Sequence, residues 1–129
     1  MAGGSQYRRG MNAQESNPTA QRSGGLAPAR PTVLEQELAY QPGAIVSRTI
    51  AKTKGGSVTL FAFDAGQELS EHTAPFDAFV QVLDGSVELT IGGVKVVTRA
   101  GETTRMPAGV PHAVRAAEPF KMILTMVRE

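Results

Sequence analysis

From residue 32 onward the chain consists of short runs rich in Val, Ile, Thr and Phe, which Gly or Pro interrupts every eight to twelve residues. No segment of this region shows the longer apolar period of an amphipathic helix. Short strands separated by turn residues are typical of an all-β sandwich or barrel. We therefore expect nine strands, near residues 44–53, 56–63, 69–73, 78–83, 86–91, 94–99, 103–106, 111–116 and 119–127.

Two dipeptides in this region predict tight turns. The Asp-Gly pair at 84–85 and the Gly-Gly pair at 92–93 each separate two predicted strands. Both pairs tolerate the positive φ angles of a primed hairpin turn. Residues 78–99 are therefore expected to form a three-stranded meander. In its middle strand, 86–91, apolar and polar residues alternate, as they do in a strand with one buried face.

The N-terminal residues differ in composition. Residues 1–31 are rich in Gly, Ser, Pro, Gln and Asn, and their few apolar residues show no period. Such a segment cannot offset its own ordering entropy, so we predict a disordered tail, within which Met11 is an alternative translation start. Residues 32–129 then form a single barrel domain, because 129 residues suffice for one core. The segment 32–43 fits neither period and is expected to be an edge strand or an arm that crosses to a second subunit.

Charge and composition exclude several function classes. The net charge is only +1, with no run of Lys or Arg beyond the tail, so nucleic acid is not an expected partner. No apolar stretch is long enough to span a bilayer and no signal sequence is visible, so we expect a cytoplasmic protein without membrane contact. The chain has no cysteine, so any metal would rest on imidazole, carboxylate, amide or thioether donors. There is also no phosphate-binding glycine loop and no nucleophile elbow.

Two stretches carry a regular pattern of Gly, Pro and His. The first, residues 66–85, reads GQELSEHTAPFDAFVQVLDG, and the second, residues 101–116, reads GETTRMPAGVPHAVRA. The pair resembles the two cupin motifs, G-x5-H-x-H-x3-E-x6-G and G-x5-P-x-G-x2-H-x3-N. Every glycine, the proline and two histidines fall on register. The resemblance covers about residues 44–127 and implies a single double-stranded β-helix, the cupin or jelly-roll barrel, of the short kind found in bacteria.

The same resemblance implies a metal site of which only part is present. In metal-binding cupins the histidines and the acidic residue of these motifs hold a divalent metal. His72 and His112 match ligand positions, whereas Ala74 stands in place of the second histidine and Ala78 in place of the acidic residue. Because stable sites usually draw three or four protein ligands, two interpretations stay open. Either His72 and His112 hold a divalent transition metal, or they are hydrogen-bonded histidines of a metal-free barrel.

Neighbouring residues were considered as substitutes for the missing ligands. Strand alternation directs Glu71 and Thr73 away from the His72 side. Glu68 and Ser70 share the parity of His72 and remain candidates. Asp77 and Gln81 are candidates only if a bulge at residues 75–77 shifts the strand register. Thioethers with imidazole would suit Cu(I), but the shared parity of Met122 and Met126 indicates a methionine-lined core. Arg105 and Arg115 are expected to face outward.

The two alanines also predict a pocket. Replacing bulky ligands by Ala74 and Ala78, with Met106 nearby, leaves apolar volume for a small ligand, which His72 and His112 could contact by hydrogen bonds or acid–base chemistry. We therefore expect a small-molecule-binding barrel. The alternatives are a metal-dependent cupin enzyme, an oxygenase or isomerase acting on a small organic acid or sugar, and a metal-free structural or interaction module. All three functions stay open because a single fold can host many unrelated chemistries, so the fold does not identify the function.

The predicted strand 78–83 bears on assembly. Its residues are apolar on both faces except for Gln81, and a strand of this kind must be covered on both sides. A second subunit would supply the cover, so we predict a homodimer.

Overall fold

The computed structural model describes residues 21–22 and 25–128. Within them it contains one 3-10 turn, η2 (Leu34–Gln36), and ten strands. The strands are β2 (Gln21–Arg22), β3 (Ile45–Thr53), β4 (Gly56–Phe63), β5 (Glu68–His72), β6 (Asp77–Asp84), β7 (Ser86–Ile91), β8 (Val94–Arg99), β9 (Thr103–Met106), β10 (His112–Arg115) and β11 (Phe120–Val127). The predicted all-β class is confirmed, and each of the nine predicted strands is present with ends shifted by at most one residue.

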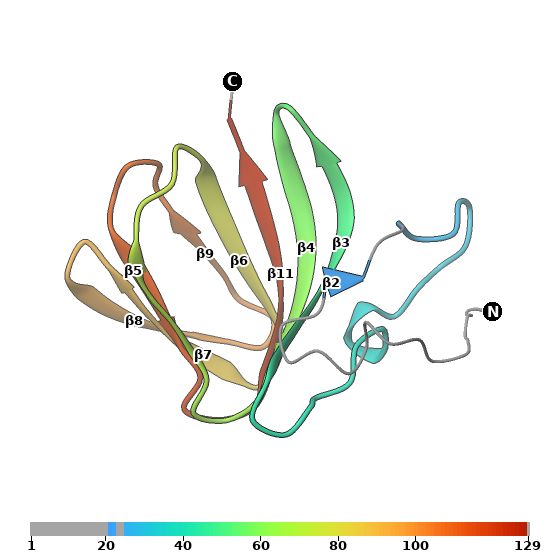
Figure 1. The fold of residues 1–129 in the computed structure, drawn as a ribbon, viewed down its shortest axis with the longest axis horizontal. Coiled ribbons are helices and arrows are strands. Elements are labelled where there is room, and N and C mark those ends of the chain that lie inside the picture. The colour runs from blue at the N-terminus through green and yellow to red at the C-terminus, as the bar shows by residue number, and fades with distance from the viewer. Residues whose placement is uncertain (1–20, 23–24, 129) are drawn as a thin grey trace.

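The strands form two sheets that face each other. The larger sheet has the order β2-β3-β4-β11-β6-β9, and the smaller has the order β5-β10-β7-β8. Figure 1 shows that the two sheets converge at one end and separate at the other. We call the first the narrow end, where β4, β6, β8 and β10 end. The second is the wide end, where β5 ends at His72 and β10 begins at His112.

The predicted meander over residues 78–99 is wrong. β7 pairs with β8 as expected, through a turn in which Gly92 and Gly93 have φ values of 56° and 84°. β6, however, pairs with β11 and β9, and so belongs to the other sheet. Gly85 carries the chain from one sheet to the other at a φ of 74°, and a Cβ there would lie 2.2 Å from the Pro119 carbonyl oxygen. The Asp-Gly pair therefore forms a corner between sheets and not a hairpin turn.

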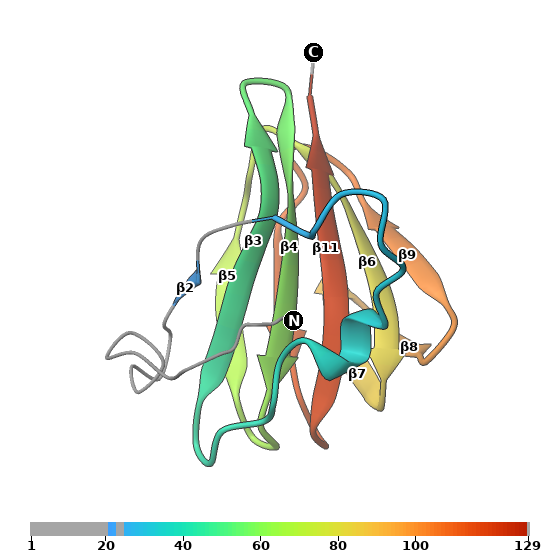
Figure 2. The same ribbon diagram turned by 90° about the vertical axis from the view of Figure 1, so that its right-hand side faces the viewer.

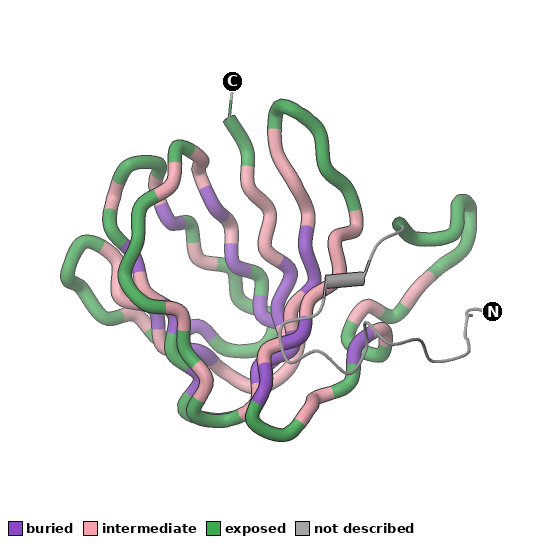
Figure 3. The backbone as a smooth tube through the Cα atoms, in the orientation of Figure 1, coloured by how far each residue is buried: buried purple, intermediate pink, exposed green. Residues whose placement is uncertain are grey.

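The largest buried side chains of the interior lie near the narrow end. Phe63, Val82, Val87 and Phe120 are at most 1% exposed, and the rings of Phe63 and Phe120 lie 4.7 Å apart. Figure 3 shows much of the buried backbone there, with more intermediate and exposed positions toward the wide end. Burial continues to the wide end at Ala78, Met106 and His112.

The outer face of the six-stranded sheet is also apolar, and residues 25–43 of the same chain cover it, as Figure 2 shows. We call these residues the strap. Leu34, Leu38 and Tyr40 of the strap pack on a second cluster from the sheet, made of Val46, Ile50, Val58, Leu60, Ala62, Leu83 and Ile123. The prediction of an edge strand over 32–43 is therefore wrong, because these residues form a 3-10 turn and irregular chain. The predicted crossing of the arm and the homodimer stay predictions.

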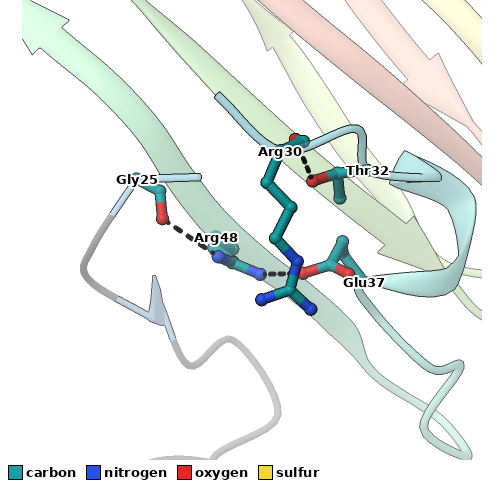
Figure 4. Close-up of polar contacts among 5 residues, drawn as sticks. All are labelled: Gly25, Arg30, Thr32, Glu37 and Arg48. Carbon is teal, nitrogen blue, oxygen red and sulfur yellow. Dashed lines mark hydrogen bonds and ion pairs between the residues drawn. The ribbon is translucent and has the colours of Figure 1, made fainter. Parts of the chain in front are cut away.

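Polar contacts fasten the strap along its length. Arg48 donates to the Glu37 carboxylate at 2.6 Å and to the Gly25 carbonyl at 3.2 Å (Figure 4). The Tyr40 hydroxyl donates to the Asp84 carboxylate. Burial, together with the hydrogen bond and negative charge of Asp84, raises the pKa of Tyr40 far above its usual value. Tyr40 therefore stays a neutral donor, and the strap is held at both of its ends.

Most of the predicted disordered tail, residues 1–20 and 23–24 together with Met11, lies outside the described residues. Gln21–Arg22 form the short strand β2, which pairs parallel with β3. Among the described residues there is no helix with the length and apolarity needed to cross a membrane.

Candidate functional site

The two histidines of the chain lie side by side at the wide end. His72 is the last residue of β5 and His112 the first of β10, and they are cross-strand partners in an antiparallel pair. The register between these strands shifts between His112 and Val114. Such an irregularity re-aims side chains locally. The two motifs therefore deliver their histidines to one point because their strands pair directly.

The imidazole rings contact each other through their Nε2 atoms. These atoms are 3.1 Å apart, and the ring planes are inclined by 73°. The Nδ1 atoms point the other way, 2.7 Å from the Ser70 carbonyl oxygen and 3.2 Å from the Val110 carbonyl oxygen. A carbonyl oxygen only accepts, so an Nδ1 atom that hydrogen-bonds one carries a proton. The hydrogen bond between the two Nε2 atoms likewise needs a proton on one of them.

The environments of the two rings differ. His112 is 4% exposed, whereas His72 is exposed. Burial, and secondly the positive charge that His72 can carry, lowers the pKa of His112, against the opposing effect of the Val110 carbonyl. His112 is therefore the neutral acceptor of the pair. His72 is the donor, and it is the ring that solvent or a ligand can reach.

A group of half-buried apolar side chains lines the interior beside the main core. Its members pack against that core without being enclosed by it, and they are Phe61, Leu69, Ile91, Leu124 and Met126. Ile91 and Met126 lie toward the wide end and Leu124 near the middle of β11, whereas Phe61 and Leu69 lie nearer the narrow end. Ile91 is the cross-strand partner of His112 on the side away from His72. None of these residues was among the predicted pocket residues. Their parity marks them as inward-facing, but strand alternation says nothing of how far along the barrel the packing is complete.

The three residues predicted to line a pocket have different environments. Ala78 and Met106 are cross-strand partners that are 2% and 3% exposed, so both belong to the packed core. Met126 pairs with Ala78 on its other side, and Met122 is also buried, in agreement with a methionine-lined core. Ala74 is half-buried in the connection after β5, where its carbonyl accepts a hydrogen bond from Gly109 at 2.9 Å.

The candidate substitutes for missing metal ligands are engaged elsewhere. Asp77 accepts hydrogen bonds from the Ala108 amide at 2.9 Å and from Arg105 at 3.1 Å. The hydrogen bond from the Ala108 amide, and to a smaller extent Arg105, lowers the pKa of Asp77. Gln81 and Glu68 are exposed, the latter opposite Arg115 across the β5–β10 pair. Arg105 and Arg115 are exposed, as expected.

These positions decide how well the site fits a resident metal. No group of three or more His, Asp or Glu side chains that could hold a metal ion occurs among the residues that the structure describes. His72 and His112 supply two imidazole donors, fewer than the three or four protein ligands of ordinary sites. The described donor set therefore does not fit a divalent metal held by the protein alone.

Comparison with known proteins places the chain in a family. The family model of the cupin domain matches residues 59–127, a range that contains both motifs. A conserved protein of unknown function from Streptococcus pyogenes is 36% identical, with a TM-score of 0.79, over 81% of this chain and 92% of that protein. A cupin 2 conserved barrel domain protein from Leptotrichia buccalis is 37% identical, with a TM-score of 0.71, over 73% of this chain and 46% of that protein.

A cupin superfamily protein from Desulfitobacterium hafniense is 23% identical, with a TM-score of 0.77, over 81% of this chain and 96% of that protein. At this identity the likeness supports the fold alone. No curated protein matches the chain. The family match covers more than half of the 129 residues and agrees with the two facing sheets, the positions of the glycines and the pairing of the histidines. The chain belongs to the cupin superfamily and has its conserved-barrel fold.

Proposed function

We propose that this cupin binds a small organic molecule at the wide end of its barrel, with the Nε2 atoms of His72 and His112 as the polar contact. One observation carries the proposal. A hydrogen-bonded imidazole pair, with its Nε2 atoms 3.1 Å apart, stands where the apolar interior is only half-buried. Ligand sites in proteins combine mainly apolar lining with a few placed polar groups.

The pair is suited to ligand contact because its orientation is fixed from behind. Each Nδ1 hydrogen-bonds a backbone carbonyl two residues earlier, so neither ring can turn without losing that bond. His72 is exposed, so a ligand can replace His112 as the acceptor of its proton. His112 would then accept a hydrogen bond from water or from a donor on the ligand, which avoids leaving a buried acceptor unsatisfied.

A second candidate is a metal-dependent cupin enzyme, an oxygenase or isomerase. It is favoured by the anchoring of both Nδ1 atoms on backbone carbonyls, which is the usual outer support of metal-binding histidines. It requires further ligands beyond the two imidazoles.

Ligand-observed NMR of the untagged full chain with a panel of small acids, alcohols, amides and sugars tests the first proposal. The wild type is compared with a His72→Ala variant and with a His72→Ala/His112→Ala double variant. Because His72 is exposed, its removal should leave the fold intact, which circular dichroism checks. Arg115→Gln, at the narrow end, serves as the matched control. We expect binding by the wild type and the control, weaker binding by His72→Ala and none by the double variant.

Elemental analysis of the unchelated protein is run in parallel. About one transition metal per chain in the wild type, absent from the double variant, would replace the first proposal by the second candidate. Panel binding that survives in the double variant would overturn the role of the histidine pair.

A further inference from the structure

The charged side chains of the barrel are divided unequally between its ends. At the wide end the described barrel strands and connections carry five basic residues and two acidic ones: Lys52, Lys54, Lys95, Arg105 and Arg128, against Glu71 and Asp77. At the narrow end six acidic residues outnumber three basic ones: Asp64, Glu68, Asp84, Glu88, Glu102 and Glu118, against Arg99, Arg115 and Lys121. Arg48, near the middle of β3, is assigned to neither end and pairs with Glu37 of the strap. Glu129 lies outside the described residues. The described barrel is therefore polarised along its axis, with its positive end at the histidines.

Arg128 is positioned at this end by two segments, the β3–β4 turn and the connection after β5. Its amide donates to the Gly55 carbonyl at 2.8 Å, and its Nε donates to the Lys54 carbonyl at 3.2 Å. Its guanidinium lies over the Phe76 ring, 4.9 Å from the centroid, in the connection that begins after His72. Among described residues no carboxylate pairs with Arg128 or Lys54, whereas Arg48, Arg105 and Arg115 each have one.

The histidine pair adds a donor to this positive surface. The Nε2 atoms of the pair lie 3.1 Å apart, and His72 is the exposed ring, so its Nε2 is the one that can donate to a ligand. A carboxylate is the natural acceptor for such a donor, because charge-assisted hydrogen bonds are stronger than neutral ones. Unpaired cations at the rim raise the local concentration of anions.

We infer that the ligand of the wide end is a small carboxylic acid in its anionic form. Its carboxylate accepts the His72 Nε2 proton within the field of Arg128 and Lys54. Its apolar part lies against the half-buried side chains Ile91, Leu124 and Met126. This inference rests on the proposed function and specifies the class of molecule that the site takes.

The test compares acids with their uncharged amides. Benzoate and benzamide, and isobutyrate and isobutyramide, are titrated into the full-length protein at low and at high salt, with binding followed by protein-observed NMR. We expect each acid to bind roughly tenfold or more tightly than its amide at low salt, with the advantage reduced at high salt. Phosphate is included to separate a general anion site from a carboxylate site.

Variants locate the charge effect. Arg128→Gln/Lys54→Gln should weaken acid binding roughly three- to tenfold at low salt and leave amide binding unchanged. Arg128→Lys, which keeps the charge, should retain the affinity of the wild type. Arg99→Gln, which removes an equal charge at the narrow end, should have little effect. Amides that bind as tightly as acids, or phosphate that binds as tightly as both acids, would overturn the carboxylate inference while leaving the proposed function standing. Failure of acids, amides and the wider panel alike would overturn both.

Discussion

The two ends of the barrel are built from the same strands and yet differ in almost every physical respect. At the narrow end the inward side chains are enclosed and acidic residues predominate outside. At the wide end part of the apolar lining, including Ile91 and Met126, is only half-buried, cations predominate and two imidazoles face each other. Complete packing at one end supplies the stability that allows the other end to remain incompletely packed. The comparison assigns stability to the narrow end and ligand contact to the wide end.

The largest expected difference between the ends concerns their inward apolar side chains. Phe120→Ala should destabilise the protein by about 3–5 kcal/mol, because Phe120 is fully buried and leaves a cavity against Phe63. Met126→Ala, at a half-buried position of the wide end, should cost roughly 1–2 kcal/mol. Urea unfolding measures both, and Phe120→Leu serves as a milder variant if Phe120→Ala does not fold. Equal losses at the two positions would contradict the packing gradient.

Two glycines provide the next comparison. Gly85→Ala should cost about 2 kcal/mol or more, because a positive φ is combined with a Cβ 2.2 Å from the Pro119 oxygen. Gly93→Ala, in the β7–β8 turn at the wide end, has a similar φ of 84° but nothing within 4 Å, so about 1 kcal/mol is expected. Thermal unfolding of both variants checks the ranking. A reversed order would mean that the chain does not cross tightly between the sheets at Gly85.

A pH effect is expected from His112. Burial lowers its pKa in the folded protein, so the unfolded chain, with an ordinary value of about 6.5, binds more protons at mildly acidic pH. Stability should therefore fall as the pH is lowered from 7 to 5 and recover on return. The pKa of Asp77 is also lowered, but its contribution is lost only at more acidic pH.

Melting temperatures measured across this range test the effect. His112→Gln should flatten the profile, whereas His72→Gln should keep most of the slope, because burial is the main cause of the lowered pKa. A His112→Gln profile as steep as that of the wild type would assign the pH dependence to other groups.

The smallest effect is expected at the exposed member of the pair. His72→Ala should change the stability by less than about 1 kcal/mol, since His72 is exposed and its hydrogen bonds are replaced by water. Chemical denaturation measures this, beside a larger loss in His112→Ala. A large loss in His72→Ala would give the pair a structural role.

Much of the fold could be predicted from local sequence, and the failures have a common physical cause. Strand limits follow from turn residues, and the meeting of His72 and His112 is implied by the resemblance of the two motifs to those of cupins. The Asp-Gly pair before β7 looks like a hairpin turn, because its contact with Pro119 lies far away in sequence. The strap has no period, because it is irregular chain whose apolar residues meet distant positions such as Leu60 and Ile123.

The site was only partly predictable for the same reason. The resemblance placed Ala78 at a ligand position with Met106 nearby, but it could not show that both lie within the packed core. The roles of Leu124 and Met126 depend on how far along the barrel the two sheets remain close together. Arg128 is held by segments that precede it by more than fifty residues, which no local pattern records.

Chemical-shift mapping of the full-length protein with the tightest-binding member of the panel is the most direct measurement. Binding at the wide end predicts shifts confined to the ends of β5, β6, β10 and β11, with the largest at His72 and His112, and no shifts in the His72→Ala/His112→Ala variant. Shifts centred on the narrow end or the strap, or unchanged shifts in the double variant, would contradict the assignment of ligand contact to the histidine end.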